Sequence, residues 1–291
     1  MKKRKKFNLE DFIFDLVVYT ILLAFTLACL LPIWHIVMAA FSNTTDIATT
    51  KGIMLWPKKI DLGAFKLVFK HRGLMLGFKN TLLYLAGSLP INLLLTVMCG
   101  YFLSCKNLMW KKQIAGIITF TMFFSGGMIP HYLNIRDLGL IDSLWALILS
   151  GAMSVYNAMI CKTSIEAIPD SLRESAYIDG ANDFQVIFKI ILPLIKATLA
   201  VLTLYYGVSH WNSWFNASIY LRTEDKLPMQ NILRAILTAN NNNDLDVDDF
   251  NAYAETIRYA AIVFSTLPVM CVYPFLQKYF AKGALIGAVK G

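Results

Sequence analysis

Charged residues are scarce in this chain. Only 16% of its 291 residues are Asp, Glu, Lys or Arg, 57% are hydrophobic, and the mean hydropathy is +0.53. Soluble domains carry about 25% charged residues. The shortage argues against an ordinary soluble protein and indicates a polytopic membrane protein, for which the apolar runs described below predict an all-α fold.

Motifs for nucleotide, metal and disulfide chemistry are also missing. The sequence contains no G-x-x-x-x-G-K-[ST], no H-E-x-x-H and no C-x-x-C. His35, His71, His131 and His210 are isolated, and we expect packing or interfacial roles for His35 and His210, which lie near the ends of apolar runs. The cysteines are scattered, and we expect mostly lipid-buried free thiols at Cys29, Cys99, Cys105, Cys161 and Cys271. No catalytic residue, metal or bound cofactor is predicted for this chain.

One acidic segment resembles a calcium loop only in part. Asp244, Asp246, Asp248 and Glu255 fall at loop positions 1, 3, 5 and 12, but Asp249 stands where the sharp turn needs glycine. We therefore expect segment 240–255 to be a solvated external loop without calcium.

The net charge of +8 does not indicate nucleic acid, because five of the 27 basic residues lie in MKKRKK at the N-terminus. Such a cluster before an apolar run is typical of a cytoplasmic anchor. With both termini cytoplasmic, the lysines between Lys51 and Lys79 oppose the rule that basic residues stay inside. The N-terminal cluster and the loop KNLMWKK decide the orientation, since the first helix usually dominates.

Six apolar runs are long enough, or nearly so, to cross a bilayer. They are Phe14–Phe41, Phe78–Leu103, Ile114–Pro130, Ser143–Cys161, Ile195–Ile219 and Tyr259–Phe280, the third being interrupted by Ser125–Gly127. The predicted organisation is a cytoplasmic tail (1–13), a first helix with an external segment (14–77), a core of five helices (78–280) and a cytoplasmic tail (281–291). Ionisable residues are nearly absent from these runs, which disfavours a proton-coupled secondary carrier.

The polar stretch 163–194 contains more structural signals than a loop needs. Ser171 and Glu174 fit a capping box for a helix over Leu172–Asp179, and Gly180 fits its left-handed end. Asn182 or Asp183 can then cap a second helix, whose predicted apolar face is Phe184, Ile187, Ile190 and Ile191. Leu192-Pro193 is expected to bend the chain into the fifth run.

At these residues the chain has Glu, a small pair, three residues, Gly, nine residues, then Ile-x-Leu-Pro. The matching positions are Glu174, Ser175, Ala176, Gly180, Ile190, Leu192 and Pro193. The pattern resembles the hallmark of permease subunits of binding-protein-dependent ABC importers, whose first small residue is alanine rather than serine. FFSGGMIPHYLNIRDLGLIDSLWALIL and YPFLQKYFAKGALIGAVKG are similar to the carbohydrate-uptake branch, and more narrowly to the polysaccharide or aldouronate (lipoprotein-type) permeases of Gram-positive bacteria.

The resemblance implies a permease fold with six transmembrane helices, in which the helix within 171–183 couples this chain to a separate dimeric cytoplasmic ATPase that uses ATP and Mg. The residues implied in coupling are Ser171, Glu174, Ser175, Ala176, Asp179, Gly180, Leu192 and Pro193. The other implied partners are a second homologous permease subunit in a heterodimer, an extracellular solute-binding lipoprotein, a carbohydrate substrate and the cell-membrane bilayer. Alternatives are an ABC permease for a non-sugar solute, a secondary carrier, or a polytopic glycan-modifying enzyme.

The end of the fifth run, TLYYGVSHWNSWFNASIYL, is rich in aromatic and amide side chains. Asn212 and Asn216 are four residues apart, which predicts one helix face. Sugars have polar edges and apolar faces, so such groups suit a translocation path. The predicted path residues are Asn157, Tyr205, Trp211, Asn212, Trp214 and Asn216. The competing interpretation is an interfacial aromatic belt.

Overall fold

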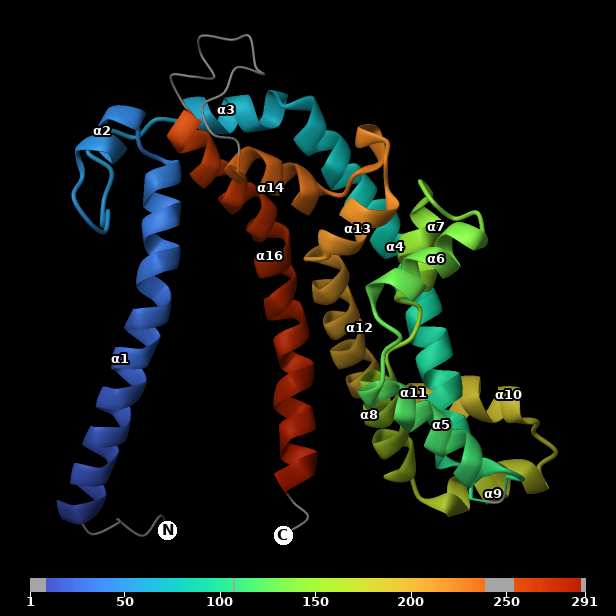
Figure 1. Ribbon diagram of the computed structural model, residues 1–291. Helices are drawn as coiled ribbons and strands as arrows, with labels where there is room; N and C mark the ends of the chain where they lie inside the picture. Colours follow the sequence, from blue (N-terminus) through green and yellow to red (C-terminus); the bar gives the residue numbers. More distant parts are fainter. Residues whose placement is uncertain (1–8, 107, 239–253, 289–291) are drawn as a thin grey trace. The chain divides into compact units, whose positions relative to one another are not determined.

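The computed structural model describes residues 9–106, 108–238 and 254–288. In this part of the chain the regular structure is helical, apart from one isolated antiparallel bridge between Ser42 and Ile60 (Figure 1). The all-α prediction is therefore confirmed. The chain divides into two compact units, residues 1–71 with 236–266 and residues 72–235 with 267–291. The functional division predicted at residues 14, 78 and 281 stays a prediction.

The first unit is organised around a long N-terminal helix. It contains α1 (Leu9–Ala40), α2 (Thr44–Thr49), α3 (Gly63–Lys70) and the first part of α16 (Ala254–Ala288). His35 and Trp34 on α1 fasten the segment after α2, because His35 Nδ1 accepts from Met54 N at 2.9 Å and Trp34 Nε1 donates to Leu55 O at 2.8 Å. His35 also packs edge-on against Tyr259, so the packing role expected for it is confirmed.

The second unit is organised around one long helix, α4. Its elements are α4 (Arg72–Ser104), α5 (Lys111–Phe123), α6 (Met128–Asp137), α7 (Leu144–Ser150), α8 (Val155–Glu166), α9 (Asp170–Ile178), α10 (Asp183–Gln185), a π-helix (Val186–Ile191), α11 (Leu192–Leu194), α12 (Lys196–Trp211), α13 (Phe215–Tyr220), a 3₁₀ turn (Glu224–Lys226) and α14 (Met229–Thr238), whose last residues lie in the first unit. α4 packs against α8 and α12. The approach to α8 is close because Gly100 has no side chain, and a Cβ there would lie 3.0 Å from the Cys161 side chain.

The apolar runs appear as three straight helices and three bent pairs. α1, α4 and α16 are each long and apolar enough to span a bilayer, and counting each bent pair as one span gives up to six. The α5–α6 pair bends by 114°, with Gly127 at φ 88°, which confirms the interruption predicted in the third run. The bend of 51° between α7 and α8 was not predicted.

The fifth run differs most from its prediction. The helical pair Asp183–Leu194 and Lys196–Trp211 bends by 85° around Ile195, which confirms a bend next to Leu192-Pro193. The straight part then ends at Trp211, and α13 starts a separate helix at Phe215. Asn212 caps α12 and Asn216 lies in α13. The prediction that these two asparagines share one helix face is therefore wrong, because the helix breaks between them.

The cysteines of the described residues are free, as expected. Cys29 and Cys271 are exposed, Cys161 is buried, and Cys99 and Cys105 are intermediate. The acidic loop predicted over 240–255 falls almost entirely on residues outside the described ranges.

Candidate functional site

The α9 helix begins two residues earlier than its sequence predicted. It starts at Asp170, with Pro169 at the N-cap position, and no side chain caps it. Ser171 is thus an internal helical residue, and the predicted capping box between Ser171 and Glu174 is wrong. Asp170 suits the first turn because a carboxylate there interacts favourably with the helix dipole. Glu174 is exposed and does not cap the helix.

Gly180 ends α9 as the sequence predicted. Its φ is 80°, a left-handed conformation that glycine adopts without steric cost. Gly180 N donates to Tyr177 O at 3.0 Å, and Ala181 N donates to Ala176 O at 2.9 Å. These two bonds form a Schellman motif, which satisfies the last carbonyls of the helix. The turn fixes the angle at which the chain leaves α9.

The next helix is capped by Asn182. Its side chain accepts from Gln185 N at 2.9 Å, and Gln185 Oε1 accepts from Asn182 N at 3.0 Å, forming a capping box. Asp183 is the first helical residue instead. The chain then continues as a π-helix, in which Val186, Ile187 and Ile191 are buried. Of the predicted apolar face, Ile187 and Ile191 are buried, whereas Phe184 is 63% exposed.

α9 and the helical segment that follows it pack against the end of α4 and share one hydrophobic core with it. The buried members of this core come from α4, α8, α9, the π-helix and α12: Val97, Tyr101, Cys161, Ile165, Ile168, Ala176, Val186, Ile187, Ile191, Ile195 and Leu202. Ala176, the small residue of the family pattern, is the buried member from α9. Its size lets α9 lie close to the helices beneath it.

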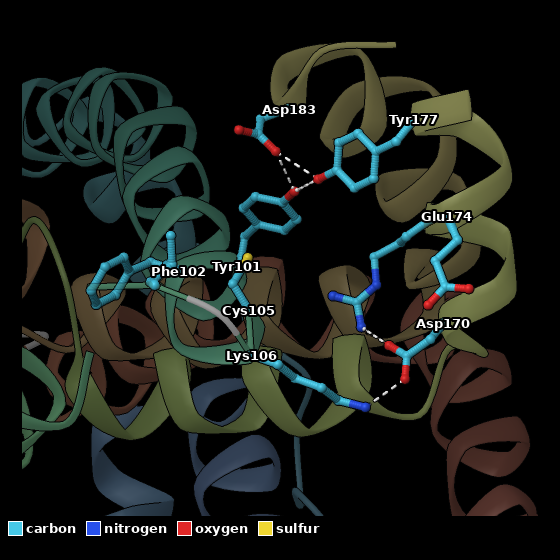
Figure 2. A pocket seen from close by; sticks show the side chains of 10 residues that line it. Tyr101, Phe102, Cys105, Lys106, Asp170, Glu174, Tyr177 and Asp183 are labelled. Carbon is cyan, nitrogen blue, oxygen red and sulfur yellow. Dashed lines mark hydrogen bonds and ion pairs between the residues drawn. The ribbon is translucent and has the colours of Figure 1, made fainter. Parts of the chain in front are cut away.

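A hydrogen-bonded triad joins α9, α10 and α4 beside this core (Figure 2). The hydroxyls of Tyr101 and Tyr177 lie 2.7 Å apart, and they reach Asp183 Oδ1 at 2.8 and 2.7 Å respectively. Burial, together with donation to Asp183, raises the pKa of Tyr177. Both phenols therefore remain protonated donors at neutral pH.

A second polar link joins α9 to the segment after α4. Lys106 Nζ and Arg173 Nη2 each lie 2.6 Å from a different carboxylate oxygen of Asp170. The Lys106 ammonium, followed by the Arg173 guanidinium, lowers the pKa of Asp170. The triad and this clamp border a cavity of about 520 Å³, which Glu174 and Cys105 also line. Figure 2 shows these side chains around it.

Most residues of this site carry no local signal in the sequence. Tyr101 and Lys106 lie about 70 residues before α9, and nothing in their local pattern relates them to it. The other predicted coupling residues lie where the sequence placed them: Ser175 and Asp179 are exposed on or next to α9, and Leu192 and Pro193 form α11 before the bend.

The six predicted path residues differ in exposure: two are buried, three are exposed and one is partly buried. Asn157 and Trp211 are 5% exposed, and Trp211 packs edge-on against Phe78. The exposed group is Tyr205, Asn212 and Asn216. Trp214 is partly buried beneath the Arg234 guanidinium, which lies 3.5 Å from its ring centre. Their role in a path stays a prediction.

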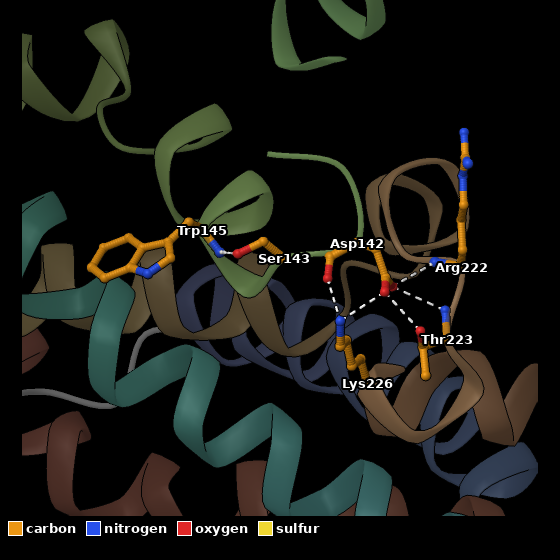
Figure 3. Close-up of polar contacts among 6 residues, drawn as sticks. All are labelled: Asp142, Ser143, Trp145, Arg222, Thr223 and Lys226. Carbon is orange, nitrogen blue, oxygen red and sulfur yellow. Dashed lines mark hydrogen bonds and ion pairs between the residues drawn. The ribbon is translucent and has the colours of Figure 1, made fainter. Parts of the chain in front are cut away.

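A further polar cluster connects two turns of the second unit (Figure 3). Asp142 has a φ of 60° and accepts hydrogen bonds from Arg222 N, Thr223 N, Thr223 Oγ1 and Lys226 Nζ at 2.7–3.0 Å. The Lys226 ammonium, with the Thr223 and Arg222 donors, holds the pKa of Asp142 far below its usual range. The Arg222 side chain points away from the cluster.

The chain is similar in sequence to known membrane transport proteins. Residues 11–285 match the family model described as "Binding-protein-dependent transport system inner membrane component". The chain is 38% identical to the polygalacturonan/rhamnogalacturonan transport system permease protein YtcP of Bacillus subtilis, over 97% of this chain and all of that protein. It is 36% identical to protein LplC of the same organism, over 90% of each chain.

A solved structure is similar along nearly the whole chain. It is the crystal structure of a bacterial ABC transporter involved in the import of the acidic polysaccharide alginate, with 33% identity and a TM-score of 0.88 over 95% of this chain and 100% of that one. The chain therefore belongs to the family of binding-protein-dependent transport system inner membrane components, the permease subunits of ABC importers.

Proposed function

We propose that this permease carries an acidic oligosaccharide across the cell membrane. The similarity to a polygalacturonan/rhamnogalacturonan permease and to an alginate importer carries this proposal. Both relatives handle polymers rich in sugar carboxylates. Neutral oligosaccharides are the second candidate, because an arabinooligosaccharide permease of Halalkalibacterium halodurans is 24% identical.

The proposed mechanism is alternating access. A binding protein outside the cell delivers the sugar, and a separate cytoplasmic ATPase closes on ATP and Mg. α9 receives that closure and turns the path outward, and hydrolysis resets it. The chain contributes no catalytic site, and both of its termini lie in the cytoplasm. Its proposed partner in the membrane is a second, homologous permease subunit.

The contacts of α9 support its proposed coupling role. The Schellman turn at Gly180 and the capping box at Asn182 fix its position relative to the following helix. The 85° bend at Ile195 leads from this region into α12. A displacement of α9 therefore acts on α12 through the chain and on α4 through Tyr101 and Lys106.

Reconstitution tests the proposed substrate directly. The permease pair, the ATPase and the binding protein would be placed in liposomes, and uptake of oligogalacturonate compared with uptake of malto-oligosaccharides. We expect ATP-dependent uptake of the acidic sugar only. Preference for the neutral sugar would reject the substrate class, and uptake that persists without ATP would reject the ATP-driven mechanism.

A further inference from the structure

The bend between α7 and α8 leaves backbone groups that need partners. Within hydrocarbon, a carbonyl without a hydrogen bond costs several kcal/mol. Asn92 on α4, which is fully buried, donates its amide group to Gly151 O at 2.7 Å and to Ala152 O at 2.9 Å. One side chain thus satisfies two carbonyls of the bend.

These two bonds determine how the Asn92 amide is oriented. Carbonyl oxygens only accept, so the nitrogen of the amide must face Gly151 and Ala152. The Oδ1 atom of Asn92 then faces His210 Nε2 at 2.8 Å, and it can only accept. His210 must therefore carry a proton on Nε2.

The other ring nitrogen of His210 completes the chain of hydrogen bonds. Nδ1 of the neutral ring is an acceptor, and the Tyr84 hydroxyl lies 2.8 Å from it. For this tautomer of the neutral ring, the order of donation is Tyr84 to His210, His210 to Asn92, and Asn92 to the bend. The Tyr84 hydroxyl also lies 3.4 Å from Leu147 O. Gly151 leaves room for the imidazole ring, because a Cβ at that position would lie 3.3 Å from His210 Cε1.

A second contact from α12 holds the far side of the bend. Ser154 N donates to the Tyr206 hydroxyl at 2.9 Å, and that hydroxyl lies 2.7 Å from Thr96 Oγ1. Tyr206 and His210 are four residues apart and their rings are stacked. Both sides of the bend are therefore bonded through the same face of α12.

We propose that His210 is a positioning residue for transport, which acts through Asn92 to keep the fourth span bent. This inference rests on the proposed function for its transport readout. In the proposed mechanism, a displacement of α9 is transmitted to α12 and therefore moves His210. The bend between α7 and α8 then responds to movement of the coupling helix. Without the Nε2 proton, Asn92 Oδ1 loses its donor and its hold on Gly151 and Ala152 weakens.

Two substitutions separate the two ring nitrogens. In His210→Gln, the side-chain amide reaches the place of Nε2 and can donate to Asn92. In His210→Asn, the shorter amide reaches only the place of Nδ1. We expect maximal uptake by the reconstituted complex to stay within about threefold for His210→Gln and to fall by roughly tenfold or more for His210→Asn. The half-saturating substrate concentration should change little in either variant.

The native thiol of Cys161 gives a readout that does not need transport. It is buried against Gly100 of α4. In a chain whose other four cysteines are serine, maleimide should label Cys161 several times faster in His210→Asn than in His210→Gln or in the chain with His210 retained. If wild-type complexes import no acidic sugar, the proposed function fails, while this comparison still decides the inference.

Three outcomes overturn the proposal. They are equal uptake and labelling in both variants with the complex intact, failure of His210→Gln to assemble, and a stronger defect in His210→Gln than in His210→Asn.

Discussion

Tyr101 and Tyr177 are 76 residues apart in the chain, and their hydroxyl oxygens lie 2.7 Å apart. Both hydroxyls also reach Asp183 Oδ1, so two protons are shared among three short contacts. Tyr101 belongs to α4 and Tyr177 to α9. The contact therefore fixes the proposed coupling helix to the end of a second span, besides its covalent connection toward α12.

Removing the Tyr101 hydroxyl should weaken this connection. Tyr101→Phe keeps the buried ring but leaves Tyr177 and Asp183 with one donor fewer, a loss of about 1–3 kcal/mol. We expect ATP hydrolysis by the assembled complex to continue while sugar taken up per ATP falls severalfold. Tyr156→Phe, at a tyrosine that is 55% exposed on α8, is the matched control. Equal transport per ATP in both variants would contradict the prediction.

Gly180→Ala should destabilise the end of α9. A Cβ at Gly180 meets no atom within 4 Å, so the cost comes from its φ of 80° alone. A left-handed alanine costs about 1–2 kcal/mol, which we expect as a lower melting temperature of the purified permease. Gly116→Ala in α5 also meets no atom within 4 Å and lies within a helix, so it should not lower the melting temperature.

The two predicted caps can be compared by the same substitution. Asn182→Ala removes a side chain that bonds Gln185 N, and should cost about 1 kcal/mol of stability. Ser171→Ala should cost almost nothing, because Ser171 lies inside the first turn of α9 and does not cap it. Thermal unfolding of both variants measures the difference. A larger loss of stability in Ser171→Ala than in Asn182→Ala would support the predicted capping role of Ser171 and contradict the observed helix start.

The Asp170 clamp predicts how stability depends on pH. Lys106 and Arg173 lower the pKa of Asp170 in the folded state, so its contribution is present above the ordinary pKa of a carboxyl and is lost as pH falls through the lowered value. Lys106→Gln should therefore reduce the melting temperature slightly at neutral pH and have no effect in strong acid. Lys112→Gln, at another exposed lysine, should show the same dependence of melting temperature on pH as wild type. A Lys106→Gln effect that persists in strong acid would refute the clamp.

Asp142 should matter for its charge as well as its shape. Asparagine tolerates the φ of 60° and retains one acceptor, while alanine loses all four hydrogen bonds. We expect Asp142→Ala to lower the melting temperature by roughly 2–4 °C and Asp142→Asn to lower it by less. Because the pKa of Asp142 is lowered, both differences should shrink in strong acid. A melting temperature of Asp142→Asn equal to that of wild type would show that the charge contributes nothing.

Local patterns in the sequence were enough for the membrane class and for the turns around α9. Hydrophobic runs follow from composition, and Gly180 and Asn182 act on backbone groups within five residues of themselves. Such signals are contained in a short window. The interruption at Gly127 and the bend beside Pro193 were accessible for the same reason.

Contacts between distant segments became visible only in the folded chain. Tyr101, Lys106 and His210 acquire their partners from segments 64 to 126 residues away, and no local period encodes such a distance. Ser171 is not a cap because α9 begins two residues before the predicted start, at Asp170, which is bonded to Lys106 and Arg173. Short-range patterns predicted most helices and turns, since those depend on neighbouring residues, but they did not predict the 51° bend between α7 and α8 or the break between α12 and α13. Packing of the folded chain determined which polar groups are paired, because each buried donor had to find an acceptor wherever the fold brought one.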